Sequence, residues 1–517
     1  MTSIVYRTMG TILVLANLAT QSAGAGDLTA QKVKSALPEL EKLANQTLKK
    51  TGVPGMAVAI VHKDQVIYVK GFGVRQLGKD QPIDGDTVFQ LASVSKPITS
   101  TILAIQVGLG LMDWDDRVSD HDPNFSLQDP WVTRNVTFRD LLCHRSGLPD
   151  HGGDLLEDLG YSRGQVLHRL RFLKPGSSFR SHYAYTNFGY TAAAMAAARS
   201  AGKSWEDLAA EKLYRPLGMT STSSRFEDYT AAKNRALLHA QIGGKWVAKY
   251  VRDPDAQSPA GGVSSTARDL AQWIRLQLAG GKFNGKQMVP IKALAETHRP
   301  QIISRPPENP AKDRAGLYGL GWNVNYDDKG RVRLGHSGAF DMGASTVVTL
   351  LPAEDLGIAV LTNSAPRGVP EAISASFFDL VLRGKIERDY VKLFQQAFEE
   401  LNKPAYGTAV DYLKPPARSS PRLPFNAYVG TYNNVYFGPV EISEKEGALY
   451  LGMGPKKTLL PLRHWDRDVF LYQPLGEMSA GLSGVTFWVG PNRRARKVVI
   501  ENLDVNGQGT FTRAAAK

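Results

Sequence analysis

Two residues with complementary chemistry stand three positions apart in the segment FQLASVSKP, residues 89–97. Ser93 carries a hydroxyl able to attack a carbonyl, and Lys96 carries an amine able to accept the hydroxyl proton. A serine hydroxyl is a weak nucleophile without such an acceptor, and a lysine amine accepts protons only where burial or a neighbouring cation lowers its pKa. Apolar residues recur at a helical period after Pro97. We therefore expect Ser93 at or near a helix N-terminus, with Lys96 one turn later on the same face.

Two later stretches supply groups that complement a serine nucleophile. Residues 183–190 precede a helical pattern and contain the Tyr185 phenol and the Asn187 carboxamide. Residues 335–339 end one strand pattern and lead into another, and they contain the His336 imidazole. Each group also has a structural interpretation: Tyr185 as a core aromatic, Asn187 as a helix cap, and His336 as a hydrogen-bonded residue at a strand end. Ser-x-x-Lys by itself equally fits an exposed helical turn.

Taken together, the motifs resemble those of the serine β-lactamase and penicillin-binding-protein superfamily. The likeness is closer to the branch that holds class C β-lactamases, D-amino-acid peptidases and related esterases, and it covers about residues 35–385. The motifs follow the family's order: Ser93-x-x-Lys96, Tyr185-x-Asn187, and His336-x-Gly338 where many members have Lys-Thr-Gly. Supporting matches are residues 141–148, 216–219 and 259–265.

The resemblance implies how protons move in the site. Ser93 attacks a carbonyl and becomes acylated, while Lys96 and Tyr185 share the proton transfers. The lysine charge lowers the pKa of the Tyr185 phenol from its ordinary value near 10. Asn187 orients the substrate amide and hydrogen-bonds Lys96. Tyr185 activates the water that hydrolyses the acyl-enzyme.

The resemblance also implies how the substrate carbonyl is held. The backbone N–H groups of Ser93 and Ala339 form an oxyanion hole, in which each donor is typically worth on the order of 100-fold or more in rate. Gly338 lets the backbone approach the substrate closely. His336 lines the site and assists Tyr185.

The expected activity is that of an exported serine hydrolase that cleaves amide bonds of small peptides, including D-residue-containing or cell-wall-derived peptides, through an acyl-enzyme. An esterase of the same family is an alternative. A weak β-lactamase is another, because His336 replaces a lysine that helps bind a substrate carboxylate. The alternative of another class is an inactive binding or scaffold protein on the same fold. Residues 399–402 resemble a deacylation element of class A β-lactamases, but they follow the third motif, so we interpret that match as chance.

Composition excludes several other classes. The 517 residues are 43% hydrophobic and 21% charged, as in ordinary globular proteins. The net charge of +13 is accompanied by no nucleic-acid-binding motif, so the expected partner is a small-molecule or peptide substrate and not nucleic acid. The ten histidines include no His-Glu-x-x-His, so no metal is expected, and no cofactor. Gly-x-Ser-x-Gly, the α/β-hydrolase pattern, is missing around Ser337. Cys143 and His144 are neighbours in the sequence, and neighbouring side chains of one element seldom face each other. We therefore interpret Cys143 as a buried thiol and not as part of a catalytic Cys–His pair.

The N-terminus has the pattern of a cleavable signal peptide. Arg7 precedes an apolar run over residues 9–19, and residues 22–25 offer a small-residue cleavage site. The run is too short to span a bilayer. We expect a signal peptide over residues 1–25, a periplasmic or secreted mature protein, and no stable membrane span; the oligomeric state stays open.

Periodicity indicates the organisation of the rest of the chain. Helical patterns cover residues 28–52, 187–200, 205–213, 266–280 and 369–383. Strand patterns cover residues 56–62, 66–70, 319–325, 332–335, 344–351 and 357–363. This order predicts an α+β, β-lactamase/transpeptidase-like fold: an antiparallel sheet whose first strands pair with its last, flanked by helices, with an all-helical subdomain. The Ser93 helix should lie between the sheet and the helical block, in a hydrolase domain of residues 28–400.

The composition changes towards the C-terminus. A Pro- and Ser-rich linker, residues 401–424, leads into residues 425–517. Short, evenly spaced strand patterns there predict a small all-β barrel domain. Residues 425–432 resemble the opening of the lipocalin-like module found in some members of this branch. Such modules border the active site, restrict access or mediate assembly, and a purely stabilising role is the alternative.

Overall fold

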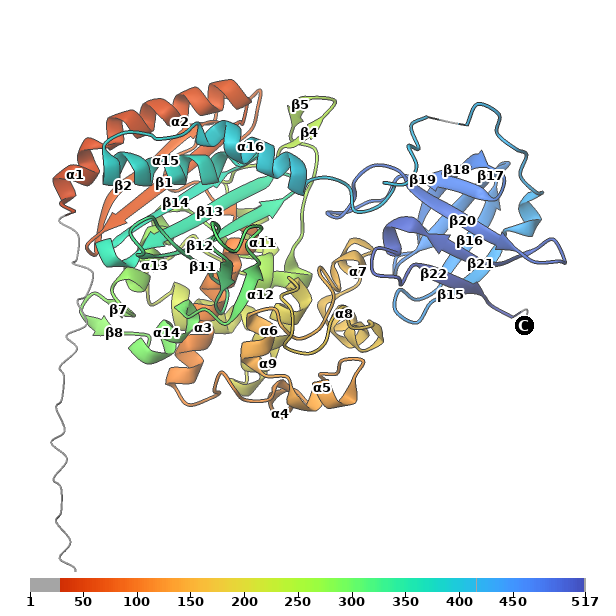
Figure 1. Cartoon of the computed structure of the whole chain (residues 1–517), viewed down its shortest axis with the longest axis horizontal. Helices are drawn as coiled ribbons and strands as arrows, with labels where there is room; N and C mark the ends of the chain where they lie inside the picture. Colours follow the sequence, from red (N-terminus) through yellow and green to blue (C-terminus); the bar gives the residue numbers. More distant parts are fainter. Residues whose placement is uncertain (1–27, 415, 516–517) are drawn as a thin grey trace, which may run out of the picture.

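The computed structural model describes residues 28–414 and 416–515 (Figure 1). The expected signal peptide lies outside the described residues. An eight-stranded antiparallel sheet forms the centre of the first part of the chain, in the order β2-β1-β14-β13-β12-β11-β10-β9. The strands are β1 Gly55–His62, β2 Gln65–Gly73, β9 Ile302–Arg305, β10 Gly316–Tyr318, β11 Asn323–Tyr326, β12 Val332–Phe340, β13 Ala344–Leu351 and β14 Leu356–Thr362.

The first strands of the sheet pair with its last, as the sequence predicted. Val58 of β1 lies opposite Val360 of β14 in the antiparallel register. All eight residues of β1 are buried, because helices cover both faces of the sheet here. The predicted α+β fold class, with its antiparallel sheet and flanking helices, is confirmed. None of the described helices is long and apolar enough to cross a membrane.

Helices form a layer on each face of the sheet. One layer contains α1 Ala30–Ser35, α2 Leu37–Thr51, α15 Val369–Arg383 and α16 Tyr390–Leu401 (Figure 1). The other begins with the 3-10 turn η1 Ala92–Val94 and α3 Ser95–Gly108, with α13 Ala267–Leu278 and α14 Ile291–His298 beside them. The helical block beyond α3 consists of α4 Val118–His121, α5 Pro130–Asn135, α6 Phe138–Leu142, α7 Asp154–Asp158, α8 Arg163–Arg169, α9 Asn187–Ser200, α10 Trp205–Ala209, α11 Phe226–Ala231 and α12 Ser258–Gly261.

Four differences from the predicted elements concern the sheet and the helices that cover it. The first helix is two, because Pro38 starts a new one in its first turn. Of the strand expected over residues 319–325, only residues 323–325 are extended, in β11; β10 ends at Tyr318, and the turn between the two strands contains Gly321 with φ +84°. Strand β12 continues to Phe340, so the His336-x-Gly338 motif lies inside it and not at its end. Helix α16 was not predicted.

The C-terminal strands close into an eight-stranded barrel (Figure 1, blue). The barrel strands are β15 Gly430–Asn433, β16 Val440–Lys445, β17 Ala448–Met453, β18 Thr458–Asp466, β19 Val469–Tyr472, β20 Ser483–Val489, β21 Ala495–Ile500 and β22 Thr510–Arg513. Large aromatic side chains such as Tyr428, Tyr432, Phe470, Phe487 and Phe511 are buried in this part of the chain. Closure removes the exposed strand edges that a small sheet would otherwise present.

Candidate active site

The turn η1 places Ser93 ahead of a buried helix. Ala92 has φ +47°, a left-handed conformation that non-glycine residues rarely adopt and that is often found next to functional side chains. The Ser95 hydroxyl stabilises this turn, since it donates to the Ala92 carbonyl at 2.7 Å and accepts from the Val263 N–H at 3.0 Å. Ser93 thus precedes α3 by two residues, close to the predicted position, while Lys96 lies in its first turn.

Lys96 is buried and has three polar neighbours. Its Nζ atom lies 3.1 Å from Ser93 Oγ, 2.7 Å from Asn187 Oδ1 and 3.0 Å from the Ala260 carbonyl oxygen. Burial lowers the pKa of Lys96 to about 7, although the negative charge of Asp154 partly offsets this. A large fraction of Lys96 is therefore neutral at pH 7. The neutral amine donates its two N–H groups to Asn187 and Ala260 and presents its lone pair to the serine hydroxyl.

Tyr185 contacts the same serine from another side. Its hydroxyl donates to Ser93 Oγ at 2.7 Å, and the Lys96 ammonium position lies 4.4 Å from its ring centroid. Burial raises the pKa of Tyr185 well above 10, and the nearby Asp154 carboxylate raises it further, outweighing the hydrogen bond to Ser93. The expectation that Lys96 lowers this pKa is wrong, because desolvation disfavours the phenolate. Tyr185 is a neutral hydrogen-bond donor.

Asn187 connects Lys96 to a carboxylate that the sequence analysis missed. Its Nδ2 group donates to Asp154 Oδ2 at 2.9 Å, and His151 Nδ1 donates to the same oxygen at 2.7 Å. Asn187 is the first residue of α9, which begins after Thr186 without a side-chain cap, so the helix-cap interpretation of Asn187 does not hold. The spacing His151-x-x-Asp154 could have indicated this pair, but nothing in it pointed to Asn187.

His336 lies on β12 and is buried. Its Nδ1 atom donates to the Ser337 carbonyl at 2.7 Å, so Nε2 accepts from the Tyr318 hydroxyl at 2.9 Å. Burial lowers the pKa of His336 to about 3, and the charge of Lys96 lowers it further, so the imidazole is neutral. The structure pairs His336 with Tyr318, a residue that the motifs did not include, while the Tyr185 ring is 6.5 Å away between centroids.

Gly338 brings β12 against the serine turn. A Cβ atom at this position would lie 2.1 Å from the Leu91 carbonyl oxygen and 3.0 Å from the Ser93 nitrogen. The neighbouring strand adds to this contact, since the Thr346 hydroxyl donates to Leu91 O at 2.7 Å. The glycine therefore permits close packing within the protein itself. It also brings the backbone of β12 at Gly338, the residue before Ala339, against the backbone of Ser93.

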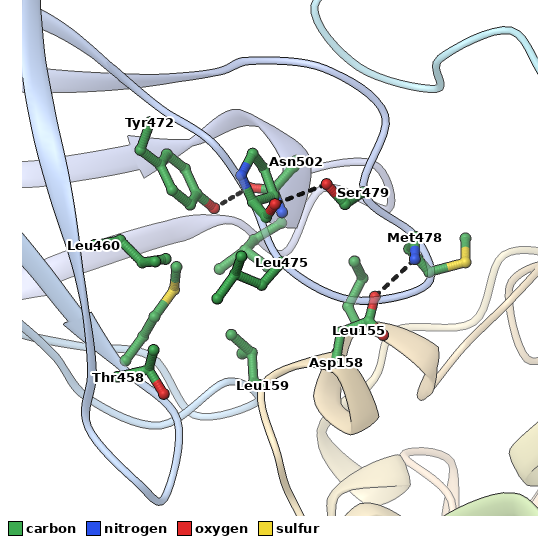
Figure 2. A pocket seen from close by; sticks show the side chains of 13 residues that line it. Leu155, Asp158, Leu159, Thr458, Leu460, Tyr472, Leu475, Met478, Ser479 and Asn502 are labelled. Atoms are coloured by element: carbon green, nitrogen blue, oxygen red, sulfur yellow. Dashed lines mark hydrogen bonds between the residues drawn. The ribbon is translucent and has the colours of Figure 1, made fainter. Parts of the chain in front are cut away.

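Helix α7 joins the site to the barrel (Figure 2). Asp154 is the first residue of this helix and Asp158 is the last. The Asp158 carboxylate accepts hydrogen bonds from the N–H groups of Glu477 and Met478 in the β19–β20 loop, both at 2.8 Å. Leu155 and Leu159 point into a cavity of about 40 Å³ at the barrel mouth. The barrel thus packs on α7, and Asp154, the first residue of α7, accepts the hydrogen bond from Asn187.

The remaining sequence candidates lie elsewhere or have other partners. Burial raises the pKa of the Cys143 thiol to about 12, and His144 Nδ1 accepts from the Thr186 N–H at 3.1 Å, so the two do not form a catalytic pair. Residues 399–402 end α16 in the helix layer on the far side of the sheet from Ser93. Across residues 28–414 and 416–515, no group of three His, Cys, Asp or Glu side chains is arranged to hold a metal ion.

Solved structures share this architecture. The octameric penicillin-binding protein homologue from Pyrococcus abyssi superposes with a TM-score of 0.58 at 20% identity, over 92% of this chain and 99% of that one. A class C β-lactamase from Rhodobacter sphaeroides gives 0.54 at 20% identity, over 68% and 99%. At these identities the likeness shows the fold.

Sequence relatives extend the comparison. "Unguisins hydrolase ungD'" of Aspergillus campestris is 26% identical over 421 residues, 76% of this chain and 75% of that protein. "Protein flp" of Staphylococcus aureus is 25% identical over 346 residues, 65% of this chain and 64% of that protein. A model of a domain of unknown function, DUF3471, matches residues 414–513, the barrel region. The Beta-lactamase family model matches residues 40–377, which hold every residue of the Ser93 site, and the chain belongs to that family.

Proposed function

We propose that this β-lactamase-family hydrolase acts through a serine acyl-enzyme on amide bonds of small peptides. One observation carries the proposal: Ser93 Oγ lies between a lysine amine and a tyrosine hydroxyl, at 3.1 Å and 2.7 Å. The amine has a pKa of about 7 and the phenol a pKa well above 10. One neighbour can therefore remove a proton from Ser93 at neutral pH, while the other can only donate one.

Acylation needs one proton acceptor and one site for the developing charge. Ser93 Oγ forms a bond to the substrate carbonyl carbon while its proton moves to the lone pair of Lys96 Nζ. The carbonyl electron pair moves to oxygen, which accepts hydrogen bonds from the N–H groups of Ser93 and Ala339. Asn187 and the Ala260 carbonyl hold the new ammonium through the contacts that they already make with Lys96.

Collapse of this intermediate breaks the carbon–nitrogen bond. The leaving nitrogen takes the proton of the Tyr185 hydroxyl. The Lys96 ammonium then gives its extra proton to the Tyr185 oxygen, so both residues return to their neutral forms. Water then attacks the acyl-enzyme, with neutral Lys96 as the base and Ser93 recovering its proton as the ester bond breaks. The pKa values support Lys96 as the base in both steps and Tyr185 as the acid.

A neutral His336 favours peptides and amides over penicillins. The third motif provides no cation to bind a substrate carboxylate, since the pKa of His336 is about 3. An amine leaving group needs the acid that Tyr185 provides, and an ester leaving group needs it less. Export follows from the signal-peptide pattern in residues 1–25 and is tested by N-terminal sequencing of the mature protein.

Mass spectrometry of intact protein tests the proposal. Wild type and Ser93→Ala are exposed to a fluorophosphonate probe, and each is incubated with D- and L-amino-acid amides, the matching esters, and nitrocefin. We expect one adduct on wild type, none on Ser93→Ala, and Ser93-dependent loss of amides. Turnover of esters alone would replace the proposal with an esterase, and turnover of nitrocefin alone with a β-lactamase. No adduct and no turnover would indicate an inactive binding protein.

A further inference from the structure

A polar pocket lies on the face of the sheet that turns away from Ser93. On this face, β13 and β14 pack apolar residues against α15, for example Val347 and Val360. At β11 and β12 the lining changes to polar side chains, and these strands enclose a cavity of about 230 Å³ with α15 and α16. We call this cavity the back pocket; its polar lining includes Asn323, Asn325, Arg333, Ser337, Glu371 and Ser374.

Glu371 of α15 contributes a carboxyl group without a partner. The residue is 9% exposed, and neither carboxyl oxygen has a hydrogen-bond partner among the described residues. Burial raises the pKa of Glu371 to about 7, and a weaker interaction with the Ser337 hydroxyl partly offsets this. A buried polar group without hydrogen bonds costs free energy that a fitting ligand would recover.

Arg333 contributes a cation at the other end of the back pocket. Its guanidinium lies 4.8 Å from the Phe378 ring centroid. Burial lowers the pKa of Arg333, and acidic groups such as Asp379 and Asp327 partly offset this from a distance, but within the described ranges no acidic side chain forms a salt bridge with it. A guanidinium recognises a carboxylate through two parallel hydrogen bonds.

The strand register sets the length of the floor of the back pocket between Arg333 and Ser337, the residue beside Glu371. Arg333, Gly335 and Ser337 alternate along β12 and share the outer face, with their ends about 13 Å apart between Cα atoms. Glycine in the middle leaves the floor without a side chain. Asn323 lies opposite Gly335 in the neighbouring strand, and Asn325 lies opposite Arg333. The floor therefore has a cation at one end, an unpaired carboxyl near the other, and amides alongside.

We propose that the back pocket is a second ligand site, which binds a short zwitterionic peptide of dipeptide length. Its carboxylate pairs with Arg333, its ammonium with Glu371, and its peptide group lies beside Asn323 and Asn325. A dipeptide separates its charged ends by about 6 Å, roughly twice the separation in a single amino acid. That length suits a site in which Arg333 reaches inward from one end of a floor about 13 Å long and Glu371 lies near Ser337 at the other end.

The back pocket and the Ser93 site lie on opposite faces of the same strand. Because residues alternate between the two faces along β12, His336 and Gly338 face Ser93, while Arg333, Gly335 and Ser337 face the back pocket. The ligand resembles what hydrolysis of a peptide releases, yet its binding does not require Ser93 to react. The two proposals can therefore fail separately.

Isothermal titration of the full-length Ser93→Ala protein with L-alanyl-L-alanine tests this site. We expect saturable binding, weakened at least tenfold by Arg333→Gln and by Glu371→Gln, and weakened less by Arg333→Lys, which keeps the charge. The matched controls are Arg383→Gln and Glu400→Gln, which remove exposed charges from α15 and α16 and should leave binding unchanged. Thermal unfolding of every variant establishes that it is folded.

A second titration separates the back pocket from the active site. Wild type whose Ser93 carries the fluorophosphonate adduct should bind the dipeptide as Ser93→Ala does. Absence of binding at 20 mM dipeptide would overturn the proposal. So would equal affinity for the neutral N-acetyl-alanine methylamide, equal affinity in the Arg333 and Glu371 variants, or loss of binding on the Ser93 adduct, which would place the ligand in the active site.

Discussion

Replacement of Asp154 by asparagine should move the acidic limb of the kcat/KM profile to lower pH. In the proposed mechanism the base of the free enzyme is Lys96, whose pKa is about 7, and the charge of Asp154 raises that pKa. Removing the charge destabilises the ammonium, so the amine stays neutral in more acidic solution. Asparagine keeps an oxygen that can accept from Asn187 Nδ2, so the hydrogen bond to Asn187 survives.

The contacts give the size of the shift. Asn187 separates the two groups, 2.7 Å from Lys96 Nζ and 2.9 Å from Asp154 Oδ2. Charges about 7 Å apart at an effective dielectric constant of about 20 attract by about 2.4 kcal/mol, or about 1.7 pKa units. The limb should therefore move from near pH 7 to between about 5 and 6. At pH 5.5, kcat/KM relative to its plateau should rise roughly 20-fold.

His151 must be separated from Lys96 in this experiment. Burial lowers the pKa of His151, but the hydrogen bond and charge of Asp154 outweigh this and raise it, so a limb belonging to His151 would move in the same direction. His151→Gln should leave the limb near pH 7, and Asp154→Asn should still shift it in that background. Asp150→Asn removes an exposed charge four residues before Asp154 and should move the acidic limb by less than about 0.3 pH units. A limb that vanishes in His151→Gln, or that stays in place in Asp154→Asn, would refute the assignment to Lys96.

Three further predictions concern single contacts. Tyr185→Phe should lower kcat on amides by about 10²- to 10⁴-fold with KM changed only a few-fold, whereas Tyr183→Phe should retain activity; equal kinetics in the two variants would remove Tyr185 from the proton transfers. Gly338→Ala forces a Cβ to within 2.1 Å of a backbone carbonyl and should lower kcat at least 100-fold, while Gly164→Ala, which has open space, should not; steady-state assays decide. Asp158→Ala leaves two half-buried N–H groups of the barrel loop unpaired and should destabilise the protein by about 1–3 kcal/mol, measured by calorimetric unfolding; an unchanged melting temperature would contradict a tight barrel contact.

The sequence predicted the groups around Ser93 because their spacing along the chain is local. Ser93 and Lys96 share one helical turn, and Tyr185 and Asn187 flank the start of another. Asp154 was missed because it reaches Asn187 only through the packing of α7, which no periodicity describes. Tyr318 was missed for the same reason. The direction of the Tyr185 pKa was wrong because the sequence shows a nearby lysine but not the depth of burial, and burial decides.

The fold was predictable where the side-chain period was regular. Strand β13 and helices α9 and α15 have the bounds that their patterns indicated. Strand β12 was cut short because Gly335 and Gly338 interrupt its alternation, although the first leaves the floor of the back pocket open and the second lets the strand meet η1. Helix α16 lay next to a change of composition that hid its apolar stripe against α15. In β12, the glycines that interrupt the alternating pattern mark the places where the strand backbone faces the back pocket or contacts the η1 turn.

One physical cause sets all three protonation states in the site. Burial lowers the pKa of Lys96, raises that of Tyr185 and lowers that of His336, in each case towards the neutral form. Within the described part of the chain, the negative charge of Asp154 opposes this effect at Lys96 and prevents its pKa from falling below about 7. The Asp154 carboxylate is separated from the buried Lys96 amine by the Asn187 amide alone. This arrangement gives a base that titrates near pH 7 beside Tyr185, an acid that stays protonated. The same neutrality leaves no cation for a substrate carboxylate next to Ser93, whereas Arg333, on the other face of the same strand, retains one.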